Sequence, residues 1–356
     1  MFVVKHHPFI HSFIVNNMKI FSPMMRRIQI ETLTACLFIL EFLTNILRFI
    51  GLGRRYYAKD NRIDGKIVLI TGANSGIGLE ATYQLCRRGA KVIMCCRDVE
   101  KGMQAADNVR RRFRCDVDID VKQLDLSCLS SIRRFGRTLP EHYDRVDILI
   151  NNAGVMMCPE LTLSSDGYEL QLATNHLGHF LLTRYVLPLM INSDDGRIIN
   201  VSTIHHIRGR IFFDDINFTK QPFSYDPVEA YCQSKLANVL FTRQLAKELS
   251  QFSTLKVYSL NPGTINTNLT RHVRGFKRII FNVIGFLFNL DVYSGVQTTL
   301  FCALEPSLRK SQSGRYYSNC KENNCLFRES FDDEAARRLW NVSCQMVGIE
   351  PGKYLP

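Results

Sequence analysis

The chain contains 356 residues, of which 46% are hydrophobic and 22% are charged, and its formal net charge is +12. This composition is close to that of ordinary globular proteins, so it excludes a disordered, collagen-like or polytopic membrane protein. The length predicts one large domain or two ordinary ones. The 12 cysteines are scattered without a CxxC pair, which argues against a zinc site or redox motif and favours a reducing compartment.

Most of the excess positive charge lies in two stretches. Residues 1–64 contain nine Lys or Arg and four Asp or Glu, a balance of +5, and residues 266–290 contain four basic residues and no acidic one. Of the total of +12, subtracting +5 and +4 leaves +3 for the rest of the chain. Both stretches adjoin apolar runs, which suits an anionic membrane surface better than a nucleic acid, and solvated charge without a partner is the alternative.

The N-terminal region is predicted to contact a membrane. Residues 1–27 form a basic lead, and residues 28–52 are the candidate anchor. Glu41 near the middle of that segment would cost about 2–3 kcal/mol, so a spanning helix and a helix lying in the interface both remain open. Residues 1–30 lack acidic residues, as transit peptides do, so a mitochondrial membrane is the alternative to the endoplasmic reticulum. Residues 53–64 are expected to be a linker.

A second basic and apolar segment spans residues 271–290. Its apolar run, Ile279 to Leu290, is too short to cross a bilayer. It is expected to be a core helix, a lid over a substrate cleft, or a second surface that contacts lipid.

Short apolar runs alternate with amphipathic stretches over residues 65–350. Strands are predicted at Lys66–Thr71, Lys91–Cys96, Val117–Gln123, Asp147–Asn152, Arg197–Ser202 and Lys256–Asn261. Helices are predicted over residues 77–88, 98–113, 127–139, 166–190, 228–250 and 331–348. Alternating strands and helices indicate a parallel sheet covered on both faces, so we expect a single α/β domain with a Rossmann-type, doubly wound parallel sheet.

The first predicted strand runs into a glycine-rich turn, TGANSGIG at Thr71–Gly78. The GxxxGxG spacing lets the backbone turn sharply and approach a pyrophosphate over the N-terminus of the next helix. A tight structural turn is the alternative, but the strand before the turn and the helix after it match the context of nucleotide binding. The residues expected to bind the cofactor here are Gly72, Asn74, Ser75, Gly76, Ile77 and Gly78.

The residue after the second strand indicates which dinucleotide binds. Arg97 stands there and is followed by Asp98. Arginine can pair with a 2′-phosphate, whereas an acidic residue would bind a 2′-hydroxyl. Arg97 therefore favours NADP(H) over NAD. Asp98 would favour NAD if the strand ended one residue later, and its alternative role is the N-cap of the next helix.

The glycine turn, NNAG at Asn151–Gly154 and YCQSKLAN at Tyr231–Asn238 occur in this order. Together they resemble the short-chain dehydrogenase/reductase family over residues 62–350. CRD at Cys96–Asp98, NHLGHF at Asn175–Phe180 and ARRLWNVSC at Ala336–Cys344 look most like its retinol dehydrogenase branch. The resemblance implies an enzyme that interconverts a lipophilic, retinol-like alcohol and its carbonyl compound. Steroid, polyprenol and lipid carbonyl substrates remain open.

Two Tyr-x-x-x-Lys pairs occur, Tyr231/Lys235 and Tyr317/Lys321. Tyr231 lies in a long predicted helix, so Lys235 shares its face, whereas Tyr317 follows a predicted strand and no helix would align its pair. Hydride transfer to a carbonyl requires a proton donor at the developing alkoxide, and we expect Tyr231 to be this acid/base. A free tyrosine, with a pKa near ~10, is a poor base at neutral pH, so the ammonium of Lys235 is expected to favour the phenolate.

The resemblance implies three further roles in the reaction. Lys235 also holds the nicotinamide ribose, and Asn175 orders a water in the proton relay. Thr203 stands where the family commonly has the second serine of a Ser-Ser pair, which orients the substrate oxygen, and Ser202 lies beside it. The added methyl and stiffer χ1 of Thr203 predict an altered substrate fit. The alternative is a catalytically weak or inactive nucleotide-binding regulatory or scaffold protein.

The resemblance also implies further cofactor contacts. They are Asp125 near the adenine, Asn152, Ala153 and Gly154 beside the ribose, and Pro262, Gly263, Thr264 and Thr267 on the nicotinamide side. Three histidines, His176, His205 and His206, have no third ligand at a suitable spacing, so no metal is expected. A lipophilic small molecule and a membrane are the expected partners, nucleic acid is not, and the oligomeric state is left open between monomer and homo-oligomer.

Overall fold

The computed structural model describes residues 56–57, 59–113, 116–220, 225–263, 291–323 and 328–351, which belong to one compact unit, Arg54–Pro356. The candidate membrane segments 28–52 and 271–290 lie outside these residues. In the described part of the chain, none of the helices is both long enough and apolar enough to cross a membrane.

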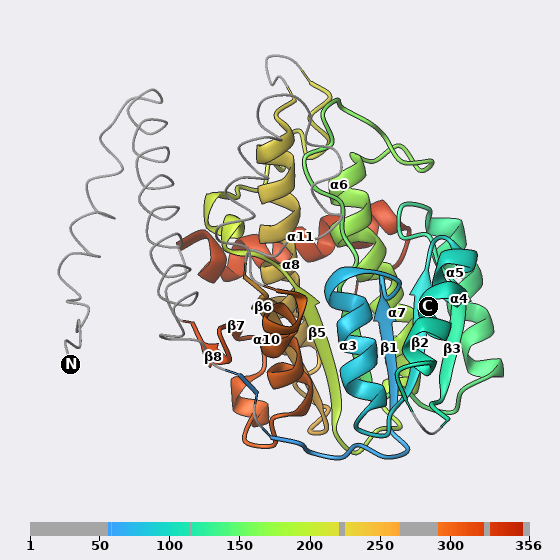
Figure 1. Ribbon diagram of the computed structural model, residues 1–356. Helices are drawn as coiled ribbons and strands as arrows, with labels where there is room; N and C mark the ends of the chain where they lie inside the picture. Colours follow the sequence, from blue (N-terminus) through green and yellow to red (C-terminus); the bar gives the residue numbers. More distant parts are fainter. Residues whose placement is uncertain are drawn as a thin grey trace. The chain divides into compact units, whose positions relative to one another are not determined.

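One eight-stranded sheet forms the centre of this unit, in the order β3-β2-β1-β4-β5-β6-β7-β8 (Figure 1). Strands β1 to β7 pair in parallel, and β8 is antiparallel to β7. The strands are β1 Ile67–Thr71, β2 Lys91–Cys96, β3 Ile119–Gln123, β4 Ile148–Asn151, β5 Gly196–Val201, β6 Leu255–Asn261, β7 Tyr316–Ser318 and β8 Lys321–Glu322. The chain order reverses between β1 and β4, which is where doubly wound sheets bind ligands.

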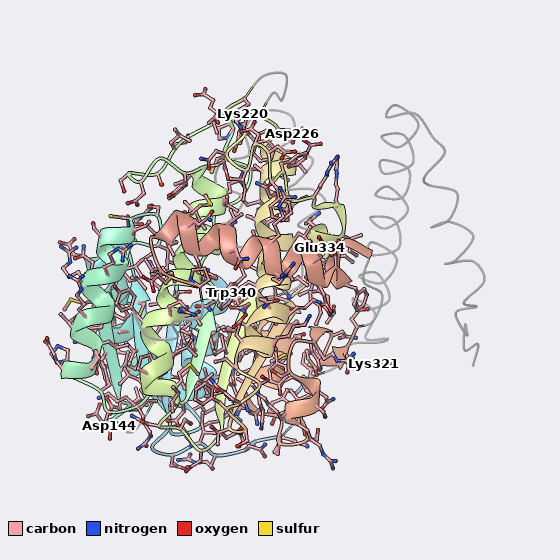
Figure 2. The ribbon with its side chains drawn as sticks, turned by 180° about the vertical axis from the view of Figure 1, so that it is seen from behind. Asp144, Lys220, Asp226, Lys321, Glu334 and Trp340 are labelled. Atoms are coloured by element: carbon pink, nitrogen blue, oxygen red, sulfur yellow. The ribbon has the colours of Figure 1, made fainter. Side chains whose placement is uncertain are left out.

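Helices cover both faces of the sheet, and α11, which carries Glu334 and Trp340, crosses in front of α8 in the view of Figure 2. The α-helices are α3 Gly76–Cys86, α4 Val99–Arg110, α5 Leu129–Thr138, α6 Leu170–Leu172, α7 Gly178–Met190, α8 Pro227–Glu248, α10 Val292–Leu304 and α11 Asp333–Val347. The other helical segments are η1 Leu139–Glu141, the π-turn η2 Ala173–Leu177, η3 Ile204–Arg208, η5 Lys310–Gln312 and η6 Arg328–Phe331.

Successive side chains of each central strand enter two separate cores. Val68 and Ile70 of β1 pack with α3, α4 and α10 on one face, whereas Leu69 packs with α5, α7, α8 and α11 on the other. The only tryptophan, Trp340, packs in the second core against Phe180 of α7, with ring centroids 5.0 Å apart. A strand buried on both faces reads as a continuous apolar run, which is why these strands were predictable from the sequence.

The structure confirms the predicted parallel α/β sheet and its six strands, with three differences. The predicted helix over residues 166–190 starts at Leu170 and contains the π-turn η2. Helix α10 was not predicted, because it is buried on most of its surface and so lacks an amphipathic period. Tyr317 lies within strand β7 rather than after a strand, and Lys321 lies in β8.

The described residues of the expected linker 53–64 are attached to the domain. The N–H of Tyr57 donates to Gln297 Oε1 at 3.0 Å, and the ammonium of Lys59 lies 2.7 Å from Glu305 Oε1. The Tyr57 side chain is 7% exposed and packs edge-on against Phe301 of α10. We call residues 56–63 the N-terminal strap.

Candidate active site

The predicted site residues that the structure describes gather at the carboxyl ends of the parallel strands. The glycine turn follows β1, Asn152 to Gly154 follow β4, Ser202 and Thr203 follow β5, and Pro262 and Gly263 follow β6. Carboxyl ends of parallel strands share one edge of a sheet, so these groups from distant parts of the sequence meet there.

The glycine turn is shaped for close approach. Gly72 and Gly76 have φ of +64° and +53°, values that favour glycine. A Cβ on Gly78 would lie 2.3 Å from the carbonyl oxygen of Gly72 and 2.7 Å from Asn152 Nδ2, so no side chain fits there. Ser75 is the N-cap of α3 but its side chain makes no capping hydrogen bond. The first N–H groups of α3 therefore lack a side-chain cap and can serve an anion.

Residues Asn152 to Gly154 are tied to the end of β1 by Thr71. The backbone N–H groups of Asn152 and Ala153 donate to Thr71 Oγ1 at 2.9 and 3.0 Å. The side-chain amide of Asn152 donates to the Thr71 carbonyl at 2.9 Å. The sequence motif of the glycine turn begins at Thr71, but the motif alone does not predict this role of its hydroxyl.

The two residues after β2 have different surroundings. Asp98 is the N-cap of α4: its side chain accepts from the N–H of Lys101 at 3.1 Å and pairs with the Lys101 ammonium at 2.7 Å. Arg97 is exposed beside the turn and has no hydrogen bond or ion pair with the described residues. Asp125, after β3, accepts from the N–H and hydroxyl of Ser127 at 2.9 and 2.6 Å, so its carboxylate also stabilises a local turn.

Tyr231 and Lys235 lie one turn apart on α8, and both are buried. The Lys235 Nζ is 5.9 Å from the centre of the Tyr231 ring and donates to the carbonyl of Val201, the last residue of β5, at 3.1 Å. Burial lowers the pKa of Lys235 to about 8. Burial also raises the pKa of Tyr231 above its ordinary value, which is opposite to the lowering that we expected from Lys235. In the protein alone, desolvation of the phenolate is the main cause of this rise, and the Cys232 thiol adds to it.

Asn175 lies in the π-turn η2, and its side chain is held by protein groups. Its Oδ1 accepts from the N–H of Val155 at 2.8 Å, and its Nδ2 donates to the Val155 carbonyl and to Ser234 Oγ, both at 2.9 Å. Both amide hydrogens are thus used, so Asn175 would order a water through Oδ1 or its backbone carbonyl rather than through Nδ2. A Cβ on Gly154 would lie 3.1 Å from Asn175 Oδ1 and 3.5 Å from Lys235 Nζ, which places these three residues together.

The two hydroxyl residues after β5 point to different partners. Ser202 is buried, and its hydroxyl donates to the Lys235 carbonyl at 2.8 Å, which ties the end of β5 to α8. Thr203 is partly exposed at the start of η3, and its hydroxyl has no partner among the described residues. Thr203 is therefore the more exposed of the two predicted substrate contacts.

The loop after β6 is described only at its start. Gly263 has φ of +88°, and its N–H donates to Asn261 Oδ1 at 3.0 Å. Thr264 and Thr267 lie outside the described residues. Within those residues, no group of three or more His, Cys, Asp or Glu side chains is arranged to hold a metal ion. His205 instead packs edge-on against Tyr231, with ring centroids 6.2 Å apart, a contact that the sequence did not indicate.

Comparisons with known proteins agree with this geometry. The family model described as short chain dehydrogenase matches residues 66–214. Retinol dehydrogenase 12 of Bos taurus is 40% identical over 322 residues, covering 88% of this chain and 99% of that protein. Retinol dehydrogenase 13 of Homo sapiens is 43% identical, covering 81% of this chain and 86% of that protein.

A solved structure of a putative uncharacterized protein from Mycobacterium Paratuberculosis has a TM-score of 0.65 and 34% identity, covering 82% of this chain and 96% of that one. The fold, the glycine turn and the alignments, which cover most of each relative's length, all indicate the same family. The chain belongs to the short-chain dehydrogenase/reductase family, an oxidoreductase family, and within it to the retinol dehydrogenase-like branch.

Proposed function

We propose that this protein is an NADP(H)-dependent oxidoreductase that interconverts a lipophilic alcohol and its aldehyde or ketone. The observation that carries the proposal is the placement of Tyr231 and Lys235 one turn apart on α8, both buried, with the Lys235 ammonium beside Gly154 and Asn175. A phenol and an ammonium beside a dinucleotide site supply the proton that carbonyl reduction requires.

The residues of the glycine turn fit a dinucleotide. The closed space at Gly78 and the uncapped start of α3 accommodate a pyrophosphate against backbone N–H groups. The exposed guanidinium of Arg97, which has no partner in the described part of the chain, suits a 2′-phosphate, while Asp98 is already engaged as an N-cap. These contacts support NADP(H) over NAD. When bound, the nicotinamide donates or accepts the hydride.

Tyr231 is proposed to move the proton at its Oη. Since burial raises its pKa, the phenol is protonated at neutral pH, which is the state needed to protonate a substrate alkoxide during reduction. Oxidation of an alcohol requires the phenolate, which additional positive charge at the site would stabilise. Thr203 is proposed to orient the substrate oxygen through its hydroxyl.

A lipophilic substrate is supported by two observations. The relatives are named retinol dehydrogenases, and the segment between β5 and α8 carries an aromatic row. Phe218 contacts Phe212 at a centroid distance of 5.2 Å and Tyr225 at 6.0 Å. A retinol/retinal pair fits these features, and steroid, polyprenol and lipid carbonyl compounds are the competing substrates.

The second candidate is a nucleotide-binding regulatory or scaffold protein without turnover, and Thr203 in place of the usual serine is the observation that favours it. Purified protein is assayed for NADPH and NADH oxidation with all-trans-retinal and a panel of steroid and lipid carbonyls, beside the Tyr231→Phe variant. The proposal predicts turnover that depends on Tyr231 and is faster with NADPH. Wild-type rates no higher than those of Tyr231→Phe across the panel would reject the enzyme and favour the scaffold.

A further inference from the structure

His179 connects the two halves of the candidate site. It lies on α7, one turn after Asn175, and is 1% exposed. Its Nε2 lies 2.8 Å from Thr71 Oγ1, at the entrance to the glycine turn. Its Nδ1 lies 2.9 Å from the backbone carbonyl oxygen of Asn175 in the π-turn. One imidazole thus joins the cofactor turn to the residue that contacts Val155 and Ser234.

The hydrogens in this chain of contacts can be assigned. A hydroxyl oxygen has two lone pairs and one hydrogen. Thr71 Oγ1 accepts from the N–H groups of Asn152 and Ala153, which uses both lone pairs. Its hydrogen must therefore be donated, either to the Ile150 carbonyl at 3.4 Å or to His179 Nε2 at 2.8 Å. The shorter contact is the stronger one, so His179 Nε2 is the acceptor.

The other ring nitrogen has the opposite role. A carbonyl oxygen only accepts, so His179 Nδ1 must carry the hydrogen that it donates to Asn175. The ring is therefore neutral, with its proton on Nδ1. A second proton on Nε2 would point at an oxygen whose lone pairs are both used. Burial lowers the pKa of His179 to about 4; the hydrogen bond to Asn175 opposes this shift, and the nearby Lys235 ammonium adds a smaller lowering. Neighbouring His176 is also buried and neutral, with a pKa lowered to about 3.

We infer that His179, as a neutral imidazole protonated at Nδ1, is a positioning residue that aligns the glycine turn with Asn175 and the Tyr231–Lys235 pair. The inference rests on the proposed function and deepens it. The Nε2 end fixes Thr71, and through Thr71 the backbone of Asn152 and Ala153. The Nδ1 end fixes the π-turn that carries Asn175. The two ends support different parts of the reaction, so they can be separated by substitution.

Two variants separate the ends. In His179→Gln, the side-chain oxygen can take the place of Nε2 and accept from Thr71, while the donor to Asn175 is lost. In His179→Asn, the amide can take the place of Nδ1 and donate to Asn175, while the acceptor for Thr71 is lost. Loss of one buried hydrogen bond is expected to change the rate or binding constant that depends on it about tenfold. We expect His179→Gln to lower kcat about tenfold with the NADPH Kd within about twofold of wild type, and His179→Asn to raise the NADPH Kd about tenfold with a smaller change in kcat.

The test uses full-length protein and two kinds of measurement. For wild type and both variants, the Kd for NADPH is measured by titration, and kcat is measured with a carbonyl substrate. Separation of Kd from kcat between the variants supports the inference, and equal losses in both, or none in either, overturn it. Nitrogen-15 NMR of histidine-labelled wild type provides a readout that does not require the variants to fold. His206 also places its Nδ1 against a backbone carbonyl, that of Thr203, and burial lowers its pKa to about 4. At least two histidines protonated at Nδ1 that do not titrate between about pH 5 and pH 8 are therefore expected, and fewer than two overturns the inference.

The outcomes also distinguish this inference from the proposed function. If wild type reduces no carbonyl compound, the proposed activity fails, and the NADPH affinities and the NMR spectrum still decide the role of His179. If wild type is active and both variants match it in kcat and Kd, the activity stands and the inference fails.

Discussion

Lys235 combines a proposed catalytic role with an unfavourable position for stability. It is 4% exposed, and the acceptor that its ammonium has among the described residues is the Val201 carbonyl. Burial lowers its pKa from 10.5 to about 8. Below pH 8 the folded protein must therefore bury the charged ammonium. Between about pH 8 and pH 10.5, Lys235 binds fewer protons in the folded protein than in the unfolded chain, so the stability of the protein rises with pH.

Replacing Lys235 by methionine should abolish turnover and stabilise the fold. At pH 7 the gain in the free energy of unfolding is expected to be roughly 2 kcal/mol, because the buried charge is removed. The gain should shrink as the pH rises from about 8 through 10.5, and it should vanish above that range, where the wild-type lysine is neutral in both states. Thermal unfolding over this range is the measurement, with the half-exposed Lys247→Met on the same helix as the control. An unstable, inactive Lys235→Met would contradict the account.

Arg97 is expected to discriminate between the two nicotinamide cofactors. Arg97→Ala removes the guanidinium that suits the 2′-phosphate, so the KM for NADPH should rise about tenfold or more while the KM for NADH changes little. Steady-state assays with both cofactors test this, with the exposed Arg111→Ala at the end of α4 as the matched control. A parallel rise in both KM values would show that Arg97 does not read the phosphate.

At the scale of elements, the N-terminal strap is expected to be part of the folded domain. Tyr57 is buried against α10, whereas its neighbour Tyr56 is 44% exposed. Tyr57→Ala should therefore lower the free energy of unfolding by about 3 kcal/mol, and Tyr56→Ala by less than about 1 kcal/mol. Denaturant titration of both variants tests the difference. Equal, small losses in the free energy of unfolding for both variants would show that these residues act only as a linker.

Local signals in the sequence were sufficient for the elements that form the cofactor side of the site. Strand β1, the glycine turn and α3 follow from an apolar run, three glycines and a helical period, all within residues 67–86. The π-turn around Asn175 was not predictable in this way, because its hydrogen-bond offset is imposed by contacts with Val155 and Ser234 from other elements.

The hydrogen-bond partners of buried polar groups could also not be predicted from the sequence. Ser202 and Thr203 are neighbours of similar chemistry, yet the hydroxyl of the first bonds to the backbone of α8, whereas that of the second has no partner among the described residues. His179 lay within a phrase that indicated the family, but its contact with Thr71 joins residues 108 positions apart. Such pairings depend on the sheet order, which brings β1 and β4 side by side.

For the whole molecule, we propose attachment to a membrane through residues 28–52, with residues 271–290 as a second contact. The position of the strap decides which deletion can test this proposal. A deletion of residues 1–60 would remove Tyr57 and Lys59 and their contacts with α10 and with Glu305, the residue after it. Deleting residues 1–53 leaves the strap intact. We expect the full-length protein to stay in the membrane pellet after carbonate extraction and the shortened protein to be released. Release of the full-length protein would reject a spanning anchor.

The central claim is that the Tyr231–Lys235 pair on α8, and not the similar pair Tyr317/Lys321, donates the proton. Both tyrosines are buried, so the loss of either hydroxyl disturbs the packing in a similar way. A difference in rate between the two variants therefore reports on the chemistry. The measurement is the single-turnover rate of carbonyl reduction with saturating NADPH in Tyr231→Phe and Tyr317→Phe. The account predicts a loss of about 10²–10⁴-fold for Tyr231→Phe and a rate within about twofold of wild type for Tyr317→Phe. Retained activity in Tyr231→Phe, or equal losses in the two variants, would contradict it.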